Sequence, residues 1–127
     1  MRVLYFQGLD YSGLHKKHNR IISLLEEGNF NALDIKKIPE AKLYRVKLDY
    51  ENRLLFRLGR YNGETCIMLL EAIYNHDYAS SRFLRGKQLD ENKLIKVASP
   101  EKEGDVAELP YLHPRSKSFN YLDKPLS

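Results

Sequence analysis

A change of hydrophobic period near residue 42 constrains the fold more than any other feature of the sequence. Before it, apolar residues recur at helical spacing; after it, three segments follow a strand pattern. These segments are KLYRVKLD (residues 42–49), RLLFRLGRY (residues 53–61) and TCIMLLEAIY (residues 65–74). The first two alternate, as half-buried strands do, and the third is apolar on both faces, which is typical of a central strand. YENR and the pair Asn62-Gly63 predict tight turns, so the three strands are expected to form an antiparallel meander.

The segment before the meander predicts helices. SGLHKKHNRIISLLEEG (residues 12–28) has one apolar stripe at helical spacing, with Ser12 as the expected N-cap and Gly28 as the stop. A shorter helix is expected in residues 31–38, before Pro39 ends it. Helices ahead of a meander can cover one of its faces. We therefore predict an α+β fold with N-terminal helices packed on an antiparallel β-meander.

Three parts of the chain differ in character. Residues 1–8 (MRVLYFQG) are either a first strand or the scar of an expression tag, because LYFQG matches most of a protease site used in such tags. Residues 9–86 hold the predicted domain, ending in YASSRFLRG, where a short helix would dock Phe83 and Leu84 on the sheet. Residues 87–127 contain four of the five prolines and predict an extended arm or interdomain linker.

Composition excludes several classes of protein. The apolar fraction of 43% and charged fraction of 30% are those of a globular domain, and no apolar run approaches the roughly 20 residues that cross a bilayer. The single cysteine, Cys66, excludes an intramolecular disulfide and a cysteine metal cage. His15 and His18 lack an accompanying acidic or sulfur ligand. We expect a cytoplasmic protein with no membrane contact, no metal and no cofactor.

Basic residues gather on one face of the predicted meander. Arg45, Lys47, Arg53 and Arg57 share the side opposite the helices if the first two strands pair. Arginines form forked contacts to phosphates, so this face would suit a polyanion. The alternative is a solvated outer face whose charge is balanced by acidic residues of the meander, namely Asp49, Glu51, Glu64 and Glu71.

The segment KLYRVKLDYENRLLFRL…IMLLEAIYNHDY (about residues 42–78) resembles the conserved half of the RelE/ParE toxin superfamily. The shared features are a basic strand, a turn, an arginine that opens an apolar strand, and a last strand ending near H-x-Y. Arg53 matches that arginine, and His76 and Tyr78 match the polar pair. Arg45 and Lys47 fall where the family has basic strand residues. Upstream helices also agree with the family.

The resemblance implies, in nuclease members, metal-independent cleavage of ribosome-bound messenger RNA by the substrate's own 2′-hydroxyl. That reaction needs a base, a cation on the phosphate and an acid. Lys47 or Glu51 would be the base, Arg53 the phosphate clamp, and His76 or Tyr78 the acid. Other members of the fold bind protein targets instead. The residues themselves also allow a plainer interpretation, in which His76 ends a strand and the Tyr78 ring packs on the sheet.

The closing FNYLDKPLS (residues 119–127) is similar to the lead into the motor of UvrD-type superfamily I helicases. The resemblance implies that the chain is the N-terminal module of a larger bacterial helicase-like polypeptide. The expected partners are therefore RNA or the ribosome, an antitoxin-like protein, or a downstream helicase domain. Two functions stay open: a nucleic-acid-facing, toxin-type endoribonuclease, and a non-catalytic interaction or regulatory module.

Overall fold

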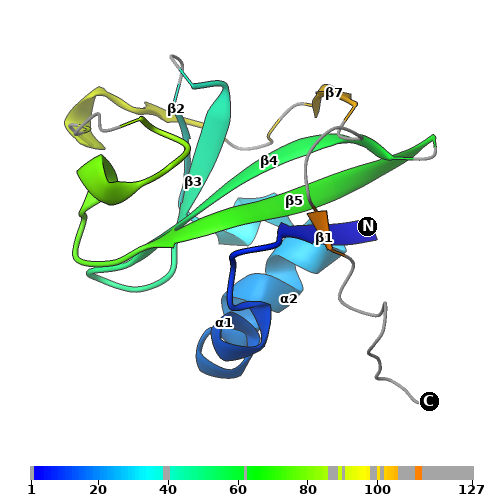
Figure 1. Ribbon diagram of the computed structural model, residues 1–127, viewed down its shortest axis with the longest axis horizontal. Helices are drawn as coiled ribbons and strands as arrows, with labels where there is room; N and C mark the ends of the chain where they lie inside the picture. Colours follow the sequence, from blue (N-terminus) through cyan, green and yellow to red (C-terminus); the bar gives the residue numbers. More distant parts are fainter. Residues whose placement is uncertain are drawn as a thin grey trace.

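The computed structural model describes residues 2–38, 41–61, 63–85, 89, 91–97, 100, 102–105 and 111–112. These residues form an α+β fold built on an eight-stranded mixed sheet with helices on one side (Figure 1). The sheet order is β6-β2-β3-β4-β5-β1-β8, and β7 pairs with β4 beside this path. The predicted α+β class is thus confirmed, while the RelE/ParE resemblance stays a prediction.

The N-terminal region begins with strand β1 (Arg2–Phe6), which pairs in parallel with the last strand of the meander. The predicted single helix is two helices, α1 (Tyr11–Lys17) and α2 (Asn19–Glu27), separated at His18. The expected N-cap was wrong: Asp10 caps α1, and its Oδ1 accepts a hydrogen bond from the Gly13 amide at 3.0 Å. The predicted stop is confirmed, because Gly28 has a φ of 74° and ends α2.

The shorter helix expected in residues 31–38 was wrong. A 3-10 turn, η1 (Phe30–Ala32), leads into strand β2 (Ile35–Ile38), which pairs antiparallel with β3. Ile35 and Ile38 are both buried, but they belong to different apolar clusters on the two sides of the sheet. Two buried residues three positions apart fit a strand that is covered on both faces as well as a helix. Pairing with β3, a long-range interaction, favoured the strand.

The predicted meander is confirmed as β3 (Leu43–Lys47), β4 (Arg53–Tyr61) and β5 (Glu64–Ile73), all antiparallel. Strand β5 is central, between β4 and β1, as its apolar composition predicted. Gly63 has a φ of 81°, as the hairpin requires, while Asn62 lies outside the described residues. A bulge between Leu55 and Phe56 shifts the register of β4 against β5.

The described parts of the predicted arm lie along the sheet. After the short turns η2 (Tyr78–Ser80) and η3 (Glu91–Lys93), strand β6 (Ile95–Lys96) pairs with β2. Strand β7 (Lys102–Asp105) runs parallel to β4, and β8 (Tyr111–Leu112) pairs with β1. The division of the chain at residue 86 stays a prediction.

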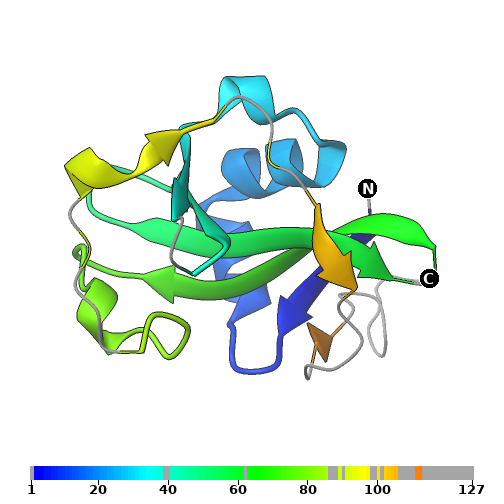
Figure 2. The same cartoon turned by 90° about the horizontal axis from the view of Figure 1, so that it is seen from above.

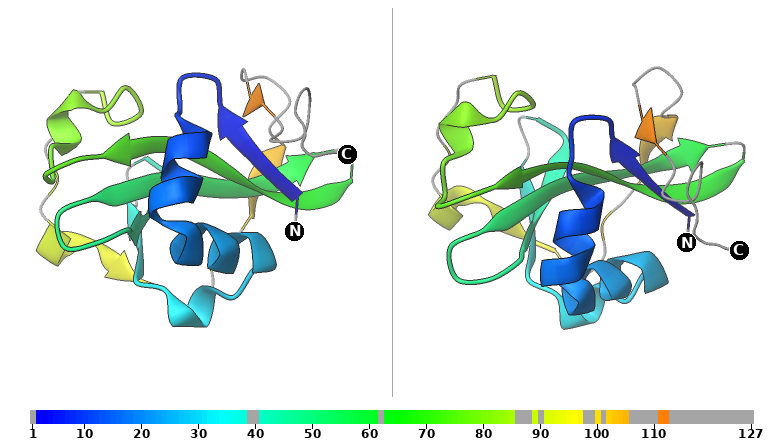
Figure 3. Two further views of the ribbon diagram at one scale, coloured as in Figure 1. Left: turned by 90° about the horizontal axis from the view of Figure 1, so that it is seen from below. Right: turned by 60° about the horizontal axis from the view of Figure 1, so that its bottom comes forward.

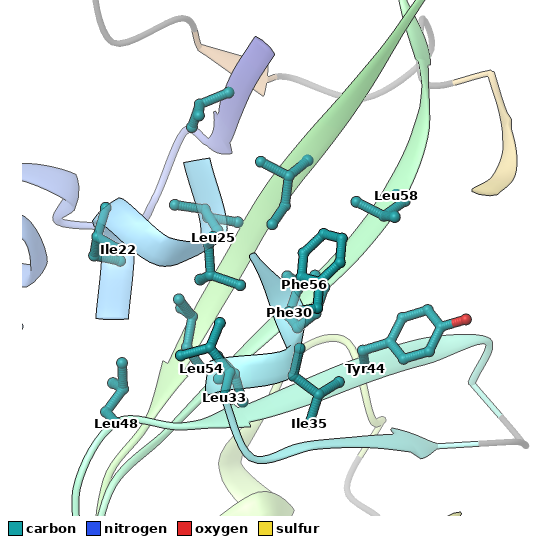
Figure 4. Packing of buried hydrophobic residues seen from close by; sticks show 14 of the residues in the cluster. Ile22, Leu25, Phe30, Leu33, Ile35, Tyr44, Leu48, Leu54, Phe56 and Leu58 are labelled. Carbon is teal, nitrogen blue, oxygen red and sulfur yellow. The ribbon is translucent and has the colours of Figure 1, made fainter. Parts of the chain in front are cut away.

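Two apolar clusters lie on opposite sides of the sheet. On the helix-covered face, Ile22 and Leu25 of α2 pack against strand residues such as Leu54 and Phe56 (Figure 4). On the opposite face, strand residues such as Met68 are covered by η2 and the segment that follows it, through Tyr78, Phe83, Leu84, Leu89 and Leu94. Figure 2 shows the strands between α2 and the green η2 turn. Phe83 and Leu84 therefore dock on the sheet as predicted, but from turns rather than a helix.

Candidate functional site

Two arginines predicted to form an exposed basic surface lie on the expected face, opposite the helices, but they are buried there. Arg45 of β3 is 2% exposed and Arg53, at the start of β4, is 6% exposed. Arg45 lies opposite Leu55 and Lys47 lies opposite Arg53, so the two arginines are diagonal neighbours on adjacent strands. The expectation of a solvated, open face was therefore wrong at both positions, because the segment after β5 covers this face.

Both arginines meet one carboxylate, that of Glu91. Arg45 Nε lies 3.0 Å and Arg53 Nε lies 3.3 Å from Glu91 Oε1. The second oxygen, Oε2, lies 2.7 Å from His76 Nδ1. Tyr78 is 1% exposed, and its hydroxyl lies close enough to Glu91 for the two groups to interact electrostatically. We call Arg45, Arg53, His76, Tyr78 and Glu91 the Glu91 cluster.

Each arginine has a second set of partners that holds its guanidinium in place. Arg45 Nη1 donates to the Asp34 carbonyl at 2.8 Å and lies 3.4 Å from the Asp34 carboxylate. Arg53 Nη1 donates to three carbonyls of the β3–β4 turn, at 2.8, 3.0 and 3.2 Å, those of Asp49, Asn52 and Tyr50. The guanidiniums are therefore positioned by the fold as well as by Glu91.

Hydrogen bonds between the β3–β4 turn and the turn that follows β5 hold the backbone of His76. The His76 amide donates to the Glu51 carbonyl at 3.3 Å, and the Asn75 amide donates to the Asn52 side chain at 3.2 Å. Asn75 and His76 have φ angles of 53° and 58°, a left-handed conformation that is uncommon outside glycine. His76 is the most exposed member of the Glu91 cluster, at 43% of its side chain. His76 therefore contacts both solvent and the partly buried Glu91 carboxylate.

The charges of the cluster shift two pKa values. Burial would raise the pKa of Glu91, but the hydrogen bond to His76 and the charges of Arg45 and Arg53 outweigh burial and lower it. Burial, and then the negative charge of Glu91, raises the pKa of Tyr78, which the two arginines oppose. The buried Tyr78 hydroxyl makes no hydrogen bond of normal geometry. It therefore stays protonated and has a proton to donate, as an acid must.

Three predicted site residues lie outside the cluster. The Lys47 ammonium is 6.0 Å from the centre of the Tyr50 ring, beside a shallow hollow of about 330 Å³ that Arg20 of α2 also lines. Glu51 is exposed in the β3–β4 turn, and its backbone carbonyl, not its carboxylate, contacts His76. Arg57 lies farther along β4, opposite Met68.

Glu91 was missed by the sequence analysis. The acids expected to balance the basic face all lie within the meander, whereas Glu91 comes from the predicted arm, 38 residues after Arg53. Its neighbours in LDENK are ordinary surface types, so nothing local marks it as a buried ion-pair partner. One of the expected acids, Glu71, instead accepts a hydrogen bond from the Ser81 hydroxyl at 2.6 Å.

A second hollow, of about 320 Å³, lies near the start of α1. Its walls come from Phe6, Leu70, Phe83 and other side chains, and the Arg82 guanidinium lies 5.0 Å from the centre of the Phe6 ring. Within the described part of the chain, no three metal-ligating side chains converge. Nor is any described helix long and apolar enough to cross a membrane.

The cluster therefore combines two fixed guanidiniums, a half-exposed imidazole and a protonated phenol around one anion. Such a set can bind an oxyanion and move protons beside it.

No family model, curated protein or solved structure matches this chain.

Proposed function

We propose that the chain is a RelE/ParE-like, nucleic-acid-facing domain whose arginine pair binds RNA phosphate. The supporting observation is that Arg45, Arg53 and His76 all lie within ion-pair distance of one anion with two oxygens, the Glu91 carboxylate. The two non-bridging oxygens of a phosphodiester present a similar target to guanidinium groups. The helices ahead of an antiparallel meander also agree with the order of elements that the resemblance implies.

In its sharp form, the proposal is a metal-independent endoribonuclease that uses the substrate 2′-hydroxyl. The attacking 2′-oxygen loses its proton and bonds to phosphorus while the 5′-oxygen leaves and takes up a proton. Arg53 and Arg45 stabilise the charge on the phosphate. His76 and the protonated Tyr78 are the candidates for the proton donor. Lys47 and Glu51 stay the predicted bases, although their side chains lie outside the Glu91 cluster.

A second candidate is a non-catalytic RelE-like interaction or regulatory module at the N-terminus of a helicase-like polypeptide. The burial of Arg45, Arg53 and Tyr78 favours it, because both arginines already form ion pairs with an internal acid. In this role the Glu91 cluster would hold the segment after residue 86 against the sheet. RNA affinity would then be weak and insensitive to the basic residues.

Expression of the chain in bacteria, together with cleavage of messenger RNA by the purified chain in the presence of ribosomes, tests the nuclease. We expect growth arrest and cleavage, both abolished by His76→Asn. Asparagine tolerates the left-handed backbone at this position, so the fold should persist. His15→Asn on α1 is the matched control and should remain active. If the unaltered chain causes no growth arrest and cleaves no messenger RNA, the nuclease is excluded.

RNA binding separates the two candidates. For a phosphate-binding face, affinity should fall as salt rises, and Arg57→Ala should weaken binding and reduce the salt slope by about one. Fluorescence anisotropy with a labelled single-stranded RNA at several salt concentrations measures both. Binding that is absent, or that does not weaken as salt rises, would favour the interaction module.

A further inference from the structure

The Glu91 cluster is completed by a segment that is weakly attached to the sheet. Residues 91–97 contribute a single 3-10 turn and the two-residue strand β6, in which Ile95 is 53% exposed. Besides the β6 pairing, Leu94 and Val97 pack against the apolar clusters on the two sides of the sheet, and two hydrogen bonds reach β2. The Lys36 ammonium donates to the Glu91 carbonyl at 3.4 Å, and the Val97 amide donates to the Ile35 carbonyl at 3.1 Å. A two-residue strand at the edge of the sheet, with an exposed side chain such as Ile95, belongs to the parts of a fold that open at low free energy.

The groups that bind the Glu91 carboxylate, namely Arg45, Arg53 and His76, are also held by residues outside this segment. Arg45 keeps its bonds to Asp34, and Arg53 keeps its three carbonyl acceptors in the β3–β4 turn. His76 is fixed through its amide by Glu51. Departure of residues 91–97 would therefore remove the anion and leave its binding groups in place. A preformed oxyanion subsite would face solvent.

We infer that Arg45, Arg53 and His76 form an oxyanion subsite for a phosphate group, and that Glu91 is its built-in occupant. This inference rests on the proposed function for the nature of the ligand. The Glu91 carboxylate takes the position of the phosphate, so the ligand binds only when residues 91–97 leave. Competition by an attached group is intramolecular, and it lowers the apparent affinity in proportion to the population of the closed state.

Glu91→Gln tests the occupant, since glutamine keeps the shape of the side chain but removes its charge. If the closed state holds about 90% of the molecules and the variant abolishes it, phosphate should bind about tenfold more tightly than to the unaltered chain. Glu27→Gln, on the exposed side of α2, is the matched control and should change nothing. The probes are inorganic phosphate, followed through the His76 ring resonances by NMR, and a short single-stranded RNA.

Val97→Pro is a second variant that leaves Glu91 intact. It removes the Val97 amide that bonds to Ile35, so it should loosen β6 and raise phosphate affinity in the same direction. Circular dichroism and amide exchange at β4 and β5 report that the sheet itself has stayed folded. A gain in both Glu91→Gln and Val97→Pro supports the inference.

The outcomes separate this inference from the proposed function. If the unaltered chain binds RNA and neither variant improves binding, the RNA-binding function stands and Glu91 is not an occupant. If the variants gain affinity for inorganic phosphate at His76 but none for RNA, the subsite stands and the RNA function fails. If no form binds either probe, the oxyanion subsite is overturned.

Discussion

The two faces of the sheet are covered in different ways. The helix-covered face is closed by α1 and α2 (Figure 3), and their apolar side chains pack on β3, β4 and β5. The opposite face is closed by turns and short extended pieces that follow β5, and at one end it contains the Glu91 cluster. Apolar packing by helices does not depend on charge, whereas ion pairs respond to pH, salt and competing anions. Both faces contain apolar packing, and the opposite face adds ion pairs whose strength depends on these conditions.

The largest effect should come from the helix-covered face. Phe56 is fully buried there and stacks on Tyr44 with ring centres 5.6 Å apart. Phe56→Ala should lower the free energy of unfolding by about 4 kcal/mol because it removes apolar contacts and leaves a cavity. Chemical denaturation measures this loss. Tyr50→Ala removes an aromatic ring that is 83% exposed and should cost no more than about 0.5 kcal/mol. Equal losses in the two variants would contradict the assigned core.

A smaller loss is expected from the opposite face. Arg45→Ala should cost about 3 kcal/mol, because it removes a buried partner of Glu91 and leaves the Asp34 carbonyl unsatisfied. Arg45→Met should cost less, since methionine retains most of the buried stem. Urea titrations of both variants, with Arg20→Met on α2 as an exposed control, measure the difference. An Arg45→Ala variant as stable as the unaltered chain would show that the ion pairs contribute nothing to this face.

The end of α2 provides a local test of the helix-covered face. Gly28 has a φ of 74°, so Gly28→Ala should cost about 1 kcal/mol through backbone strain. Gly28→Asn should cost less, because asparagine visits this conformation more readily. Thermal unfolding of the two variants ranks them. An alanine variant more stable than the asparagine variant would contradict the left-handed conformation assigned to residue 28.

The smallest effect should be the pH response of the opposite face, because Glu91 is partly exposed and solvent screens its charge. The folded pKa of Glu91 is lowered from the ordinary value of 4.5. Its contribution to stability is therefore fully present above that value and is lost as pH falls through the folded pKa. The stability difference between the unaltered chain and Glu91→Gln should shrink over this range. Urea titrations from about pH 6 to about pH 3 measure it, and a difference that stays constant would contradict the role of the carboxylate.

Local patterns predicted much of the fold. Alternation in residues 42–49 correctly assigned Tyr44, Val46 and Leu48 to the helix-covered side, and Gly28 was identified as a helix stop. Residues 31–38 were assigned wrongly because a strand buried on both faces shows no two-fold pattern. The capping residue was also missed, since Asp10 and Ser12 are both good caps and the start of α1 decides between them.

The candidate site was predicted only in part. Arg53, His76 and Tyr78 all lie near Glu91, an acid that no local pattern identified, and the roles that the resemblance implied for them stay predictions. The resemblance implied Lys47 or Glu51 as the base, but the Lys47 ammonium lies near the Tyr50 ring and Glu51 is exposed in the β3–β4 turn. A nearby position along a strand end does not determine where a long side chain lies.

Periodicity and turn chemistry act within a few residues, so the amino-acid sequence alone was enough to predict helical structure before Gly28, the meander and its central strand. The burial of Arg45 and Arg53 depends instead on the path of the chain after β5, which brings Glu91 back across 38 residues to Arg53. Such a contact is selected by the packing of the whole chain, because the energy of a charge depends on what surrounds it in space. The folded structure thus placed two of the four predicted surface residues, Arg45 and Arg53, in buried ion pairs with Glu91.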